Sequence, residues 1–536
     1  MDIKYNLNGI NLKDTPTQIA TSLKAVPLSN RTWWLPYNKT TLEKLTRIFS
    51  LTTAKWHLDK YQKIKPIPVD RTNYPHLRDY QYEDLCKIIN MKNHVNFSEM
   101  RTGKTVTTLA WANETGLNKG VVVAPKSVIV LTWEQEIKKW LPNAIIYKAY
   151  SYTGSLSVKK REQVYKDFIN DKRLCFLLVS KDTIKKDVKD ITILNHSGKK
   201  IANPNFKMNL LGKRLSDYLL ILDEATFLKN FKTQQTKVLK IVSNYAEYTS
   251  CLTGTPTPKH PINIYSIMHI INSKIFHSYY NLANYYFGVD YWGSVIETFK
   301  SPELRQEWID WLSEFGVRHT QKEVMNWLPE IERLNIGVDL DKEQLKKYND
   351  MKNKFTDEDG IRIPNVISQF TKLKVIANSP YGTKKDFVLE YLDSNEEESI
   401  MIVSRYTEKV LKPLQKILKD SGIQAELLIG STSLNDRIKI VNKVNNKEIK
   451  VLLANRICIK EGIKLPGIDT LIWFDKGSTA DNSQVESRFL PTTAEEKVNS
   501  KRIISLITFE TVDEKSENEL VVANELNSYL EEWNNL

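Results

Sequence analysis

The residues best suited to chemistry lie in the segment Ser98–Thr105, SEMRTGKT, between a short apolar stretch and a run that favours a helix. A Gly-Lys-Thr triplet at a strand-to-helix turn is typical of a loop that cradles phosphate. Gly103 lets the backbone approach phosphate oxygens, Lys104 supplies positive charge to the β- and γ-phosphates, and Thr105 offers a hydroxyl to Mg²⁺. Because Ser98 stands where the usual pattern has its first glycine, the segment alone could also be an ordinary turn at a helix start.

A pair of adjacent carboxylates, Asp223 and Glu224, supplies the second half of such a site. The pair ends the apolar run LLILDE at 219–224, which is typical of a buried strand. Open α/β sheets bind ligands at the carboxyl ends of their strands. There Asp223 could hold Mg²⁺ while Glu224 orients or deprotonates an attacking water, as phosphoryl transfer requires. A lone Asp-Glu pair is often only a helix cap, but joined to the phosphate loop it predicts nucleotide hydrolysis.

Alternating strand and helix patterns surround these residues and predict an α/β protein with parallel sheets. Short apolar runs recur between longer amphipathic stretches, in one set up to about residue 252 and in a second set after a helical middle region. Two α/β lobes are therefore expected. Fully buried strands are predicted at 121–125, 174–180 and 218–225 in the first lobe, and a second set of strands at 400–404, 425–430, 450–454, 469–474 and 502–509.

Length and composition favour a multidomain, water-soluble chain. At 536 residues, and with about 150 residues per domain as a guide, three or four units are expected. The chain is 41% hydrophobic and 26% charged and has no apolar run of about 18 residues, so no membrane span is expected. Its first residues lack the features of a presequence, which predicts a cytoplasmic location, meaning the host cytoplasm if the chain is viral.

The net charge and the cysteine content indicate which binding partners and which metal or disulfide sites to expect. The formal net charge of +13 favours a polyanionic partner through counterion release, although such an excess also occurs in proteins that bind none. The four cysteines are scattered without a CxxC pair, which favours reduced, buried thiols over a zinc site or a disulfide framework.

The first 70 residues combine clustered aromatic and basic residues, and the Pro-punctuated stretch KIKPIPVD ends them at Asp70. Trp33, Trp34 or Tyr37 could stack on the bases of single strands or junctions. The alternative, which we favour, is that these rings form a small core with lysines at the surface.

Taken together, the motifs resemble the Swi/Snf-type branch of helicase superfamily 2, in order, over most of residues 75–490. SEMRTGKT stands where that family has DEMGLGKT. The other motifs of the first lobe are similar in turn to its glutamine motif, motif Ia, motif II and motif III: LRDYQ at 77–81, VAPKS at 123–127 with Trp133 and Trp140, DEATFLKN at 223–230 and LTGTP at 252–256.

The second half continues the resemblance. A connector, LRRTKxxVxxxLP in the family, is similar to 317–324 and 328–329, and an LRxxCxHP element is similar to 373–380. Motifs IV, V and VI are similar to 400–408, 454–465 and 484–488. The motif V segment also resembles that of bacteriophage branch-migration helicases, which favours a viral or bacterial protein.

The resemblance implies a fold of two RecA-like parallel-sheet lobes with a helical connecting region and a small N-terminal accessory domain. The expected segments are an accessory, DNA-binding domain at 1–70, an ATP-binding lobe at 71–260, a helical insertion and connector at 261–370, a second lobe at 371–512 and a C-terminal helix at 513–536.

Residue roles follow position by position, with ATP and Mg²⁺ as the implied cofactors. The implied catalytic residues are Lys104, Asp223, Glu224 and Arg488, with Thr105 and Asp223 as Mg²⁺ ligands. The implied nucleotide contacts are Gln81, Arg101, Thr102, Gly103, Lys104, Thr105, Gly462 and Gln484. The implied DNA contacts, which position a backbone without reading sequence, are Lys126, Ser127, Thr253, Thr255, Ser404 and Arg405.

Two departures from the family pattern bear on activity. Arg101 and Thr102 replace Gly and Leu within the phosphate loop, a change that is tolerable if both side chains point outward. Pro491 replaces the second arginine of motif VI, so Arg488 works alone or Arg456 or Arg502 substitutes. An arginine at the γ-phosphate is worth roughly 10³–10⁵ in turnover.

The resemblance therefore implies an ATP-dependent DNA translocase or helicase that remodels branched or forked DNA in replication, recombination or repair. Its partners would be duplex, forked or branched DNA and proteins of replication or recombination, and no membrane. Two alternatives remain: a nucleotide-binding DNA scaffold with weak hydrolysis, and the motor subunit of a restriction or defence complex.

Overall fold

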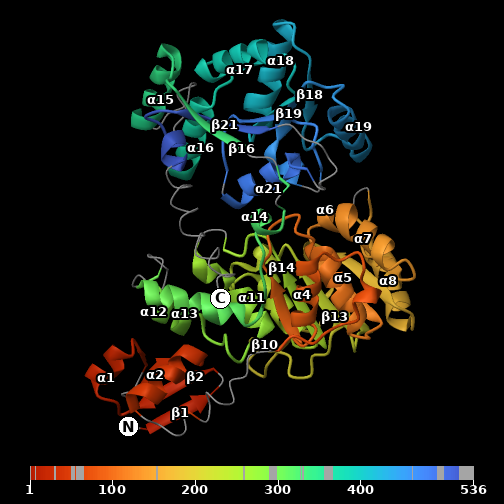
Figure 1. Cartoon of the computed structure of the whole chain (residues 1–536), viewed down its shortest axis with the longest axis vertical. Coiled ribbons are helices and arrows are strands. Elements are labelled where there is room, and N and C mark those ends of the chain that lie inside the picture. Colours follow the sequence, from red (N-terminus) through yellow and green to blue (C-terminus); the bar gives the residue numbers. More distant parts are fainter. Residues whose placement is uncertain are drawn as a thin grey trace. The chain divides into compact units, whose positions relative to one another are not determined.

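The computed structural model divides the chain into two compact units, within Met1–Val324 and Met325–Glu525 (Figure 1). It describes residues 2–6, 8–28, 32–49, 55, 65–152, 155–257, 260–288, 299–325, 327–328, 331–354, 366–460, 463–477, 479–491 and 500–517. Among these residues, no helix is both long and apolar enough to cross a membrane.

The first unit is built around a seven-stranded sheet of order β15-β5-β14-β13-β6-β8-β7, in which neighbouring strands are parallel. Its strands are β5 (Asn93–Asn96), β6 (Lys119–Ala124), β7 (Ile145–Lys148), β8 (Cys175–Ser180), β13 (Leu219–Asp223), β14 (Tyr248–Leu252) and β15 (Gly316–Val317). Because the strands are parallel, their carboxyl ends meet at one edge of the sheet.

Helices cover both faces of this sheet, which explains why its central strands read as unbroken apolar runs. Along β13, Leu220 and Leu222 enter one hydrophobic core, whereas Leu219 and Ile221 enter the other. The covering helices are α4 (Asp79–Ile88), α5 (Lys104–Glu114), α6 (Lys126–Val128), η2 (Ile129–Trp133), α7 (Glu134–Trp140), α8 (Val158–Asn170), α9 (Lys181–Asp187), α10 (Gln234–Ser243) and α11 (Tyr265–Ile271). Two short hairpins, β9–β10 (Thr192–Leu194, Lys200–Ala202) and β11–β12 (Asn209–Leu210, Lys213–Arg214), lie outside the sheet.

The N-terminal part forms a four-stranded antiparallel sheet that belongs to the same unit. It comprises β1 (Asp2–Asn6), β2 (Gly9–Lys13), β3 (Val26–Pro27), β4 (Thr32–Leu35), α1 (Thr17–Ser22) and α2 (Lys39–Phe49). The sheet packs on α12 (Tyr279–Tyr286) and α13 (Pro302–Ser313), where the ring of Trp34 meets Tyr285 edge-on at 6.3 Å. Trp34 is only 4% exposed, so the core interpretation holds for it and base stacking does not. Trp33 and Tyr37 are half-buried against the same core.

The second unit carries a six-stranded parallel sheet of order β16-β21-β20-β17-β19-β18. Its strands are β16 (Ile331–Val338), β17 (Ile400–Ser404), β18 (Ala425–Leu428), β19 (Val451–Asn455), β20 (Thr470–Trp473) and β21 (Lys501–Thr508). Its helices include α15 (Lys342–Lys354), α16 (Val366–Ala377), α17 (Thr383–Ser394), η5 (Thr407–Leu411), α18 (Lys412–Asp420), α19 (Leu434–Asn445), α20 (Arg456–Lys460) and α21 (Thr479–Phe489).

The predicted fold class, α/β with two parallel-sheet lobes, is confirmed, and the eight strands predicted from the sequence are present within about two residues. Sequence reasoning did not find β16, whose residues are mostly exposed. The helices of the predicted connector, 261–370, are divided: α11 to α13 belong to the first unit, and α15 and α16 belong to the second. Of the predicted C-terminal helix, residues 518–536 lie outside the described residues.

Candidate nucleotide-binding site

The carboxyl edge of the first sheet collects the predicted site segments of that unit. The phosphate loop follows β5, Lys126 and Ser127 follow β6, the acidic pair ends β13, and the Thr-Gly-Thr segment follows β14. Across the sheet Asp223 pairs with Leu252, and Leu252 pairs with Asn96, so these strand ends stand in one row. Residues more than 120 positions apart in the chain are thereby brought together.

Gly103 begins helix α5 in a left-handed conformation, with φ at +83°. A Cβ atom at this position would lie 2.1 Å from Nε2 of Gln81. Both the backbone conformation and the close approach of Gln81 therefore require glycine here.

Arg101 also has a positive φ, +65°, at the position where the resembled family has glycine. Left-handed backbone costs an L-residue roughly 1–2 kcal/mol, so the loop of this chain carries strain at Arg101. Thr102 is only 2% exposed, and its hydroxyl donates to the carbonyl of Glu99 at 2.8 Å. The condition that both replacing side chains point outward is thus not met at Thr102, because its hydroxyl bonds to the loop from inside.

Lys104 lies back over its own loop. Its Nζ donates to the carbonyl oxygens of Ser98 at 2.8 Å and Glu99 at 2.9 Å. These two oxygens hold the ammonium group where phosphate oxygens would compete for it. The neighbouring Thr105 is half-buried in the first turn of α5.

Asp223 is buried and held at both carboxylate oxygens. The indole Nε1 of Trp133 donates to Oδ2 at 2.8 Å, and the amide of Glu224 donates to Oδ1 at 2.8 Å. Burial raises the pKa of Asp223, while the Trp133 hydrogen bond, the charge of Lys104 and the Glu224 amide oppose that rise. Lys104 is therefore close enough to act on the Asp223 carboxylate.

Glu224 adopts a left-handed conformation, with φ at 50° and ψ at 47°, directly after β13. Such strained backbone clusters at functional sites, because the surroundings must impose it. Its side chain is half-buried, so it can meet both the buried Asp223 and a ligand outside.

Three threonine hydroxyls join the acidic segment to the segment after β14. Thr226 Oγ1 lies 2.7 Å from Thr253 Oγ1 and 3.3 Å from Thr255 Oγ1, and it donates to the carbonyl of Thr255 at 3.0 Å. Thr253 Oγ1 also accepts from the amide of Thr255 at 3.1 Å. Because Thr253 is fully buried in this network, it is placed to couple the two segments and not to meet DNA. Thr255 remains half-buried.

Gln81 is 4% exposed, and its side-chain amide is hydrogen-bonded to the phosphate loop. Its Nε2 donates to the carbonyl of Thr102 at 2.9 Å, and its Oε1 accepts from the amide of Arg78 at 3.0 Å. The structure thus places Gln81 as a support of the phosphate loop. The adenine contact predicted for it would have to use the remaining lone pair of Oε1.

These residues fit Mg²⁺ that binds together with nucleotide phosphates. Among the described residues, no group of three or more His, Cys, Asp or Glu could hold a metal ion by itself. Mg²⁺ usually takes one or two carboxylates and completes its shell with phosphates and water. Asp223 and Thr105 supply a donor set of that kind.

In the second unit, Ser404, Arg405 and Asp475 lie together at the carboxyl edge. The hydroxyl of Ser404 is buried and donates to Asp475 Oδ2, and the amide of Arg405 donates to the same carboxylate at 3.1 Å. The Arg405 side chain is exposed. Of the two predicted DNA contacts, Arg405 is therefore accessible, whereas Ser404 is committed to Asp475.

Gln484 and Arg488 lie one turn apart on α21, and both are half-buried. Gly462 falls outside the described residues. Of the arginines that could substitute at Pro491, Arg502 stands at the amino end of β21, where Glu332, Glu398 and Tyr391 bind it.

Arg456 directly follows β19 at the carboxyl edge, and its guanidinium lies 3.6 Å from Asp481. Since ligands bind at the carboxyl ends of parallel strands, its position favours Arg456 over Arg502 as the substitute.

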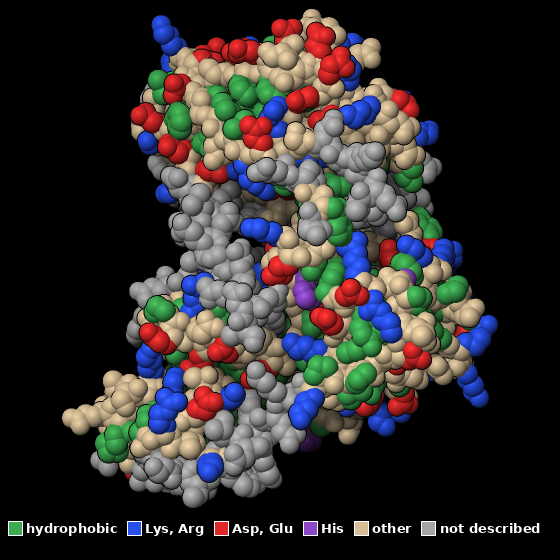
Figure 2. All heavy atoms as spheres, viewed as in Figure 1, with side chains coloured by type: hydrophobic (Ala, Val, Ile, Leu, Met, Phe, Trp, Pro, Cys, Tyr) green, Lys and Arg blue, Asp and Glu red, His purple; other side chains and the backbone are tan. Residues whose placement is uncertain are grey.

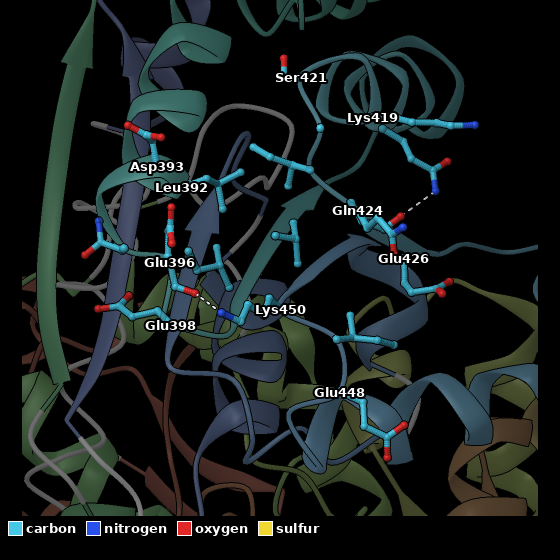
Figure 3. A pocket seen from close by; sticks show the side chains of 18 of the residues that line it. Leu392, Asp393, Glu396, Glu398, Lys419, Ser421, Gln424, Glu426, Glu448 and Lys450 are labelled. Carbon is cyan, nitrogen blue, oxygen red and sulfur yellow. Dashed lines mark hydrogen bonds between the residues drawn. The ribbon is translucent and has the colours of Figure 1, made fainter.

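A groove of about 1480 Å³ opens at the opposite, amino edge of the second sheet (Figure 3). Lys450 donates there to the carbonyl of Glu396 at 2.6 Å, and Gln415 donates to the carbonyl of Ala425 at 2.9 Å. Five carboxylates and five lysines line it, so it offers no net positive charge to a phosphate. We do not assign the groove to nucleotide binding.

Sequence reasoning missed several residues that this geometry brings to the site. Trp133 was noted only as a motif position, although its indole holds Asp223 from 90 residues away. Thr226 was read as part of a motif, and its hydrogen bonds to Thr253 and Thr255 had no signal in the spacing. His319 was read only as part of a connector, although its amide donates to the hydroxyl of Ser98 at 3.0 Å.

Comparison with known proteins finds two domain families in this chain. The SNF2-related domain matches residues 50–386, and the helicase conserved C-terminal domain matches residues 383–488. An uncharacterized ATP-dependent helicase of Mycoplasma genitalium is 23% identical over 472 residues, covering 83% of this chain and 41% of that protein. A second one, of Mycoplasma pneumoniae, is 23% identical over 87% of this chain and 43% of its own length. The chain thus spans about two fifths of these relatives.

Among solved structures, the Sulfolobus solfataricus SWI2/SNF2 ATPase core in complex with dsDNA is 20% identical, with a TM-score of 0.39. The alignment covers 86% of this chain and 93% of that one. Since the first domain match takes in more than half of the chain, this protein belongs to the SNF2-related family and carries the helicase conserved C-terminal domain.

Proposed function

We propose that this chain is a DNA-dependent ATPase that translocates along duplex DNA and remodels forked or branched DNA in replication, recombination or repair. One observation carries the proposal: the phosphate loop and the acidic pair meet at one sheet edge, where the charge of Lys104 opposes the rise that burial causes in the pKa of Asp223. Family membership supports ATP as the nucleotide.

The first unit would bind and hydrolyse the nucleotide. The amino end of α5 and Lys104 would bind the phosphates, Lys104 exchanging the carbonyls of Ser98 and Glu99 for phosphate oxygens. Asp223, oriented by Trp133, would hold Mg²⁺, which when bound neutralises phosphate charge.

Glu224 would take the proton of the water that attacks the γ-phosphorus. The bond from that phosphorus to the bridging oxygen then breaks and leaves ADP and phosphate. Thr226, Thr253 and Thr255 would pass the change at the acidic segment to the segment after β14.

The second unit would complete the reaction and contribute to DNA binding. Arg488 would stabilise the charge on the transferred phosphoryl group, with Gln484 beside it on α21. Lys126, Ser127, Thr255 and Arg405 are the contacts that we propose for the DNA backbone, which such residues grip without reading sequence. Figure 2 shows basic side chains interspersed with acidic ones over the visible face of each unit.

A second candidate is a nucleotide-binding DNA scaffold that hydrolyses slowly. The observation that favours it is Pro491 in place of an arginine, together with the strained Arg101 in the phosphate loop. Both changes would weaken turnover more than binding.

Steady-state ATP hydrolysis by the wild type and Lys104→Ala tests the proposal, each with no nucleic acid, single-stranded DNA, duplex DNA and a four-way junction. Lys172→Ala, which removes an exposed lysine of the same unit, is the control. We expect duplex or junction DNA to stimulate hydrolysis in the wild type and the control, and Lys104→Ala to abolish it. Nucleotide and DNA binding without hydrolysis in any condition would favour the scaffold.

A further inference from the structure

The segment after β15 continues alongside the phosphate loop. β15 pairs in parallel with β5, with Val317 opposite Asn96. The backbone hydrogen bonds run on past that pair: the amide of Phe97 donates to the carbonyl of Val317, and the amide of Glu99 donates to the carbonyl of His319 at 2.8 Å. The sheet ladder therefore extends into the loop itself.

Polar groups of the same segment hold three consecutive loop residues. The amide of His319 donates to Ser98 Oγ at 3.0 Å, and the amide of Gln321 donates to Glu99 Oε2 at 2.8 Å. The side-chain Nε2 of Gln321 donates to the carbonyl of Met100 at 2.7 Å. We call residues 317–321 the strap.

His319 is in turn fixed on helix α4. Its Nε2 lies 2.9 Å from Asp84 Oδ1, and its ring lies 4.9 Å from that of Tyr80. The hydroxyl of Tyr80 donates to the carbonyl of Thr102 at 2.5 Å. The loop is thus held by the strap at its start and by α4 near its end, with His319 touching both.

Ser98 and Glu99 are also the residues whose carbonyls hold Lys104. Any shift of the strap therefore moves the two oxygens that set the position of the Lys104 ammonium group. We propose that the strap positions the phosphate loop and its lysine for nucleotide, with His319 and Gln321 as positioning residues. The nucleotide part of this inference rests on the proposed function, whereas the bracing of the loop does not.

The His319 contact is also sensitive to pH. Burial opposes a charge on His319, but the hydrogen bond and charge of Asp84, with the charges of Glu323 and Glu83, outweigh it and raise its pKa. The charged pair is therefore lost as the pH rises through the raised pKa of His319, and, because burial raises the pKa of Asp84, it is also lost at lower pH when that carboxyl takes a proton. The strap should hold the loop less firmly on the alkaline side.

Hydrogen–deuterium exchange of the full chain without nucleotide tests the bracing. In His319→Ala and Gln321→Ala we expect the amides of residues 98–104 to exchange roughly tenfold faster, because the local opening free energy falls with each lost hydrogen bond. Lys322→Ala, an exposed neighbour, should leave that exchange unchanged. If His319→Ala does not fold, Gln321→Ala carries the test alone. Wild-type exchange at the loop in the folded strap variants would overturn the inference.

Kinetics in Mg²⁺ and ATP tests the positioning. The strap variants should raise KM for ATP several-fold with a smaller change in kcat. His319→Gln keeps a donor but cannot take a charge, so its KM should match the wild type at high pH and should lose the pH dependence. A KM equal to that of the wild type at every pH in all three variants would refute positioning. If no variant or wild type hydrolyses ATP while loop exchange still rises, the bracing stands and the proposed function fails.

Discussion

The two sheets end in carboxyl edges of the same kind, yet the polar residues at these edges are organised differently. At the first edge, Asp223 and Thr226 each bond to another segment, namely to Trp133 and to Thr253, while Lys104 bonds back to its own loop. At the second edge, Ser404 and the Arg405 amide converge on one carboxylate, Asp475, and the Arg405 side chain is left exposed.

The difference shows that the parallel sheet supplies only the place, and that the loops supply the chemistry. The first edge has a left-handed glycine, a helix that begins at it and a buried carboxylate, which together suit a phosphate with its metal. The second edge has arginines and a buried aspartate, which suit an accessory role toward phosphate. Variants that remove one group from either edge test this difference.

At the second edge, Arg488→Ala should have the largest effect on turnover, since an arginine at the transferred phosphoryl group is worth about 10³-fold or more. We expect kcat to fall by that order while nucleotide binding by the first unit is kept. Arg502→Ala, at the amino edge, should change kcat only several-fold. Single-turnover hydrolysis measures kcat, and fluorescent-nucleotide binding measures affinity. Equal losses of kcat in both variants would contradict a difference between the carboxyl and amino edges of the second sheet.

Trp133→Phe should come next, because it removes the indole donor and leaves the buried Asp223 carboxylate short of a hydrogen bond. Such a loss costs about 1–3 kcal/mol, or roughly 5- to 150-fold in kcat/KM. The bond lowers the pKa of Asp223, so its removal should shift the acid limb of the pH–rate profile to higher pH. Trp308→Phe, equally buried but in α13, controls for lost packing and should leave the acid limb in place.

Arg405→Ala should weaken DNA binding several-fold at low salt and reduce the slope of log K against log salt by about one. Ser404→Ala should leave that slope unchanged and instead lower the melting temperature, because its hydroxyl is buried against Asp475. Fluorescence anisotropy with a duplex over a salt series separates the two. A slope change in Ser404→Ala would mean that the hydroxyl leaves Asp475 when DNA binds.

The smallest effect is expected from Arg101→Gly, which relieves the left-handed backbone of the phosphate loop. We expect the first thermal transition to rise by an amount equivalent to about 1 kcal/mol. Thermal unfolding with and without nucleotide reports the change. A lower transition temperature would show that the Arg101 side chain contributes more than its backbone costs.

Sequence reasoning found what is encoded locally. The central strands are buried on both faces and so stand out as apolar runs, and Gly103, Lys104 and Asp223 belong to short motifs. The exposed edge strand β16 has no such run and was missed. The bond between Trp133 and Asp223, like the strap, joins residues that only the strand order brings together, so spacing along the chain carries no trace of it.

The strap is also synthesised much later than the phosphate loop that it holds. His319 lies 221 residues beyond Ser98, so a ribosome adding about 5–20 residues per second needs on the order of 10–45 s between them. During that interval β5 has no neighbouring strand on the side that β15 later occupies, and the phosphate loop lacks its hydrogen bonds to the strap. A nascent chain that ends before residue 316 should therefore carry the complete phosphate-loop sequence and still bind nucleotide poorly.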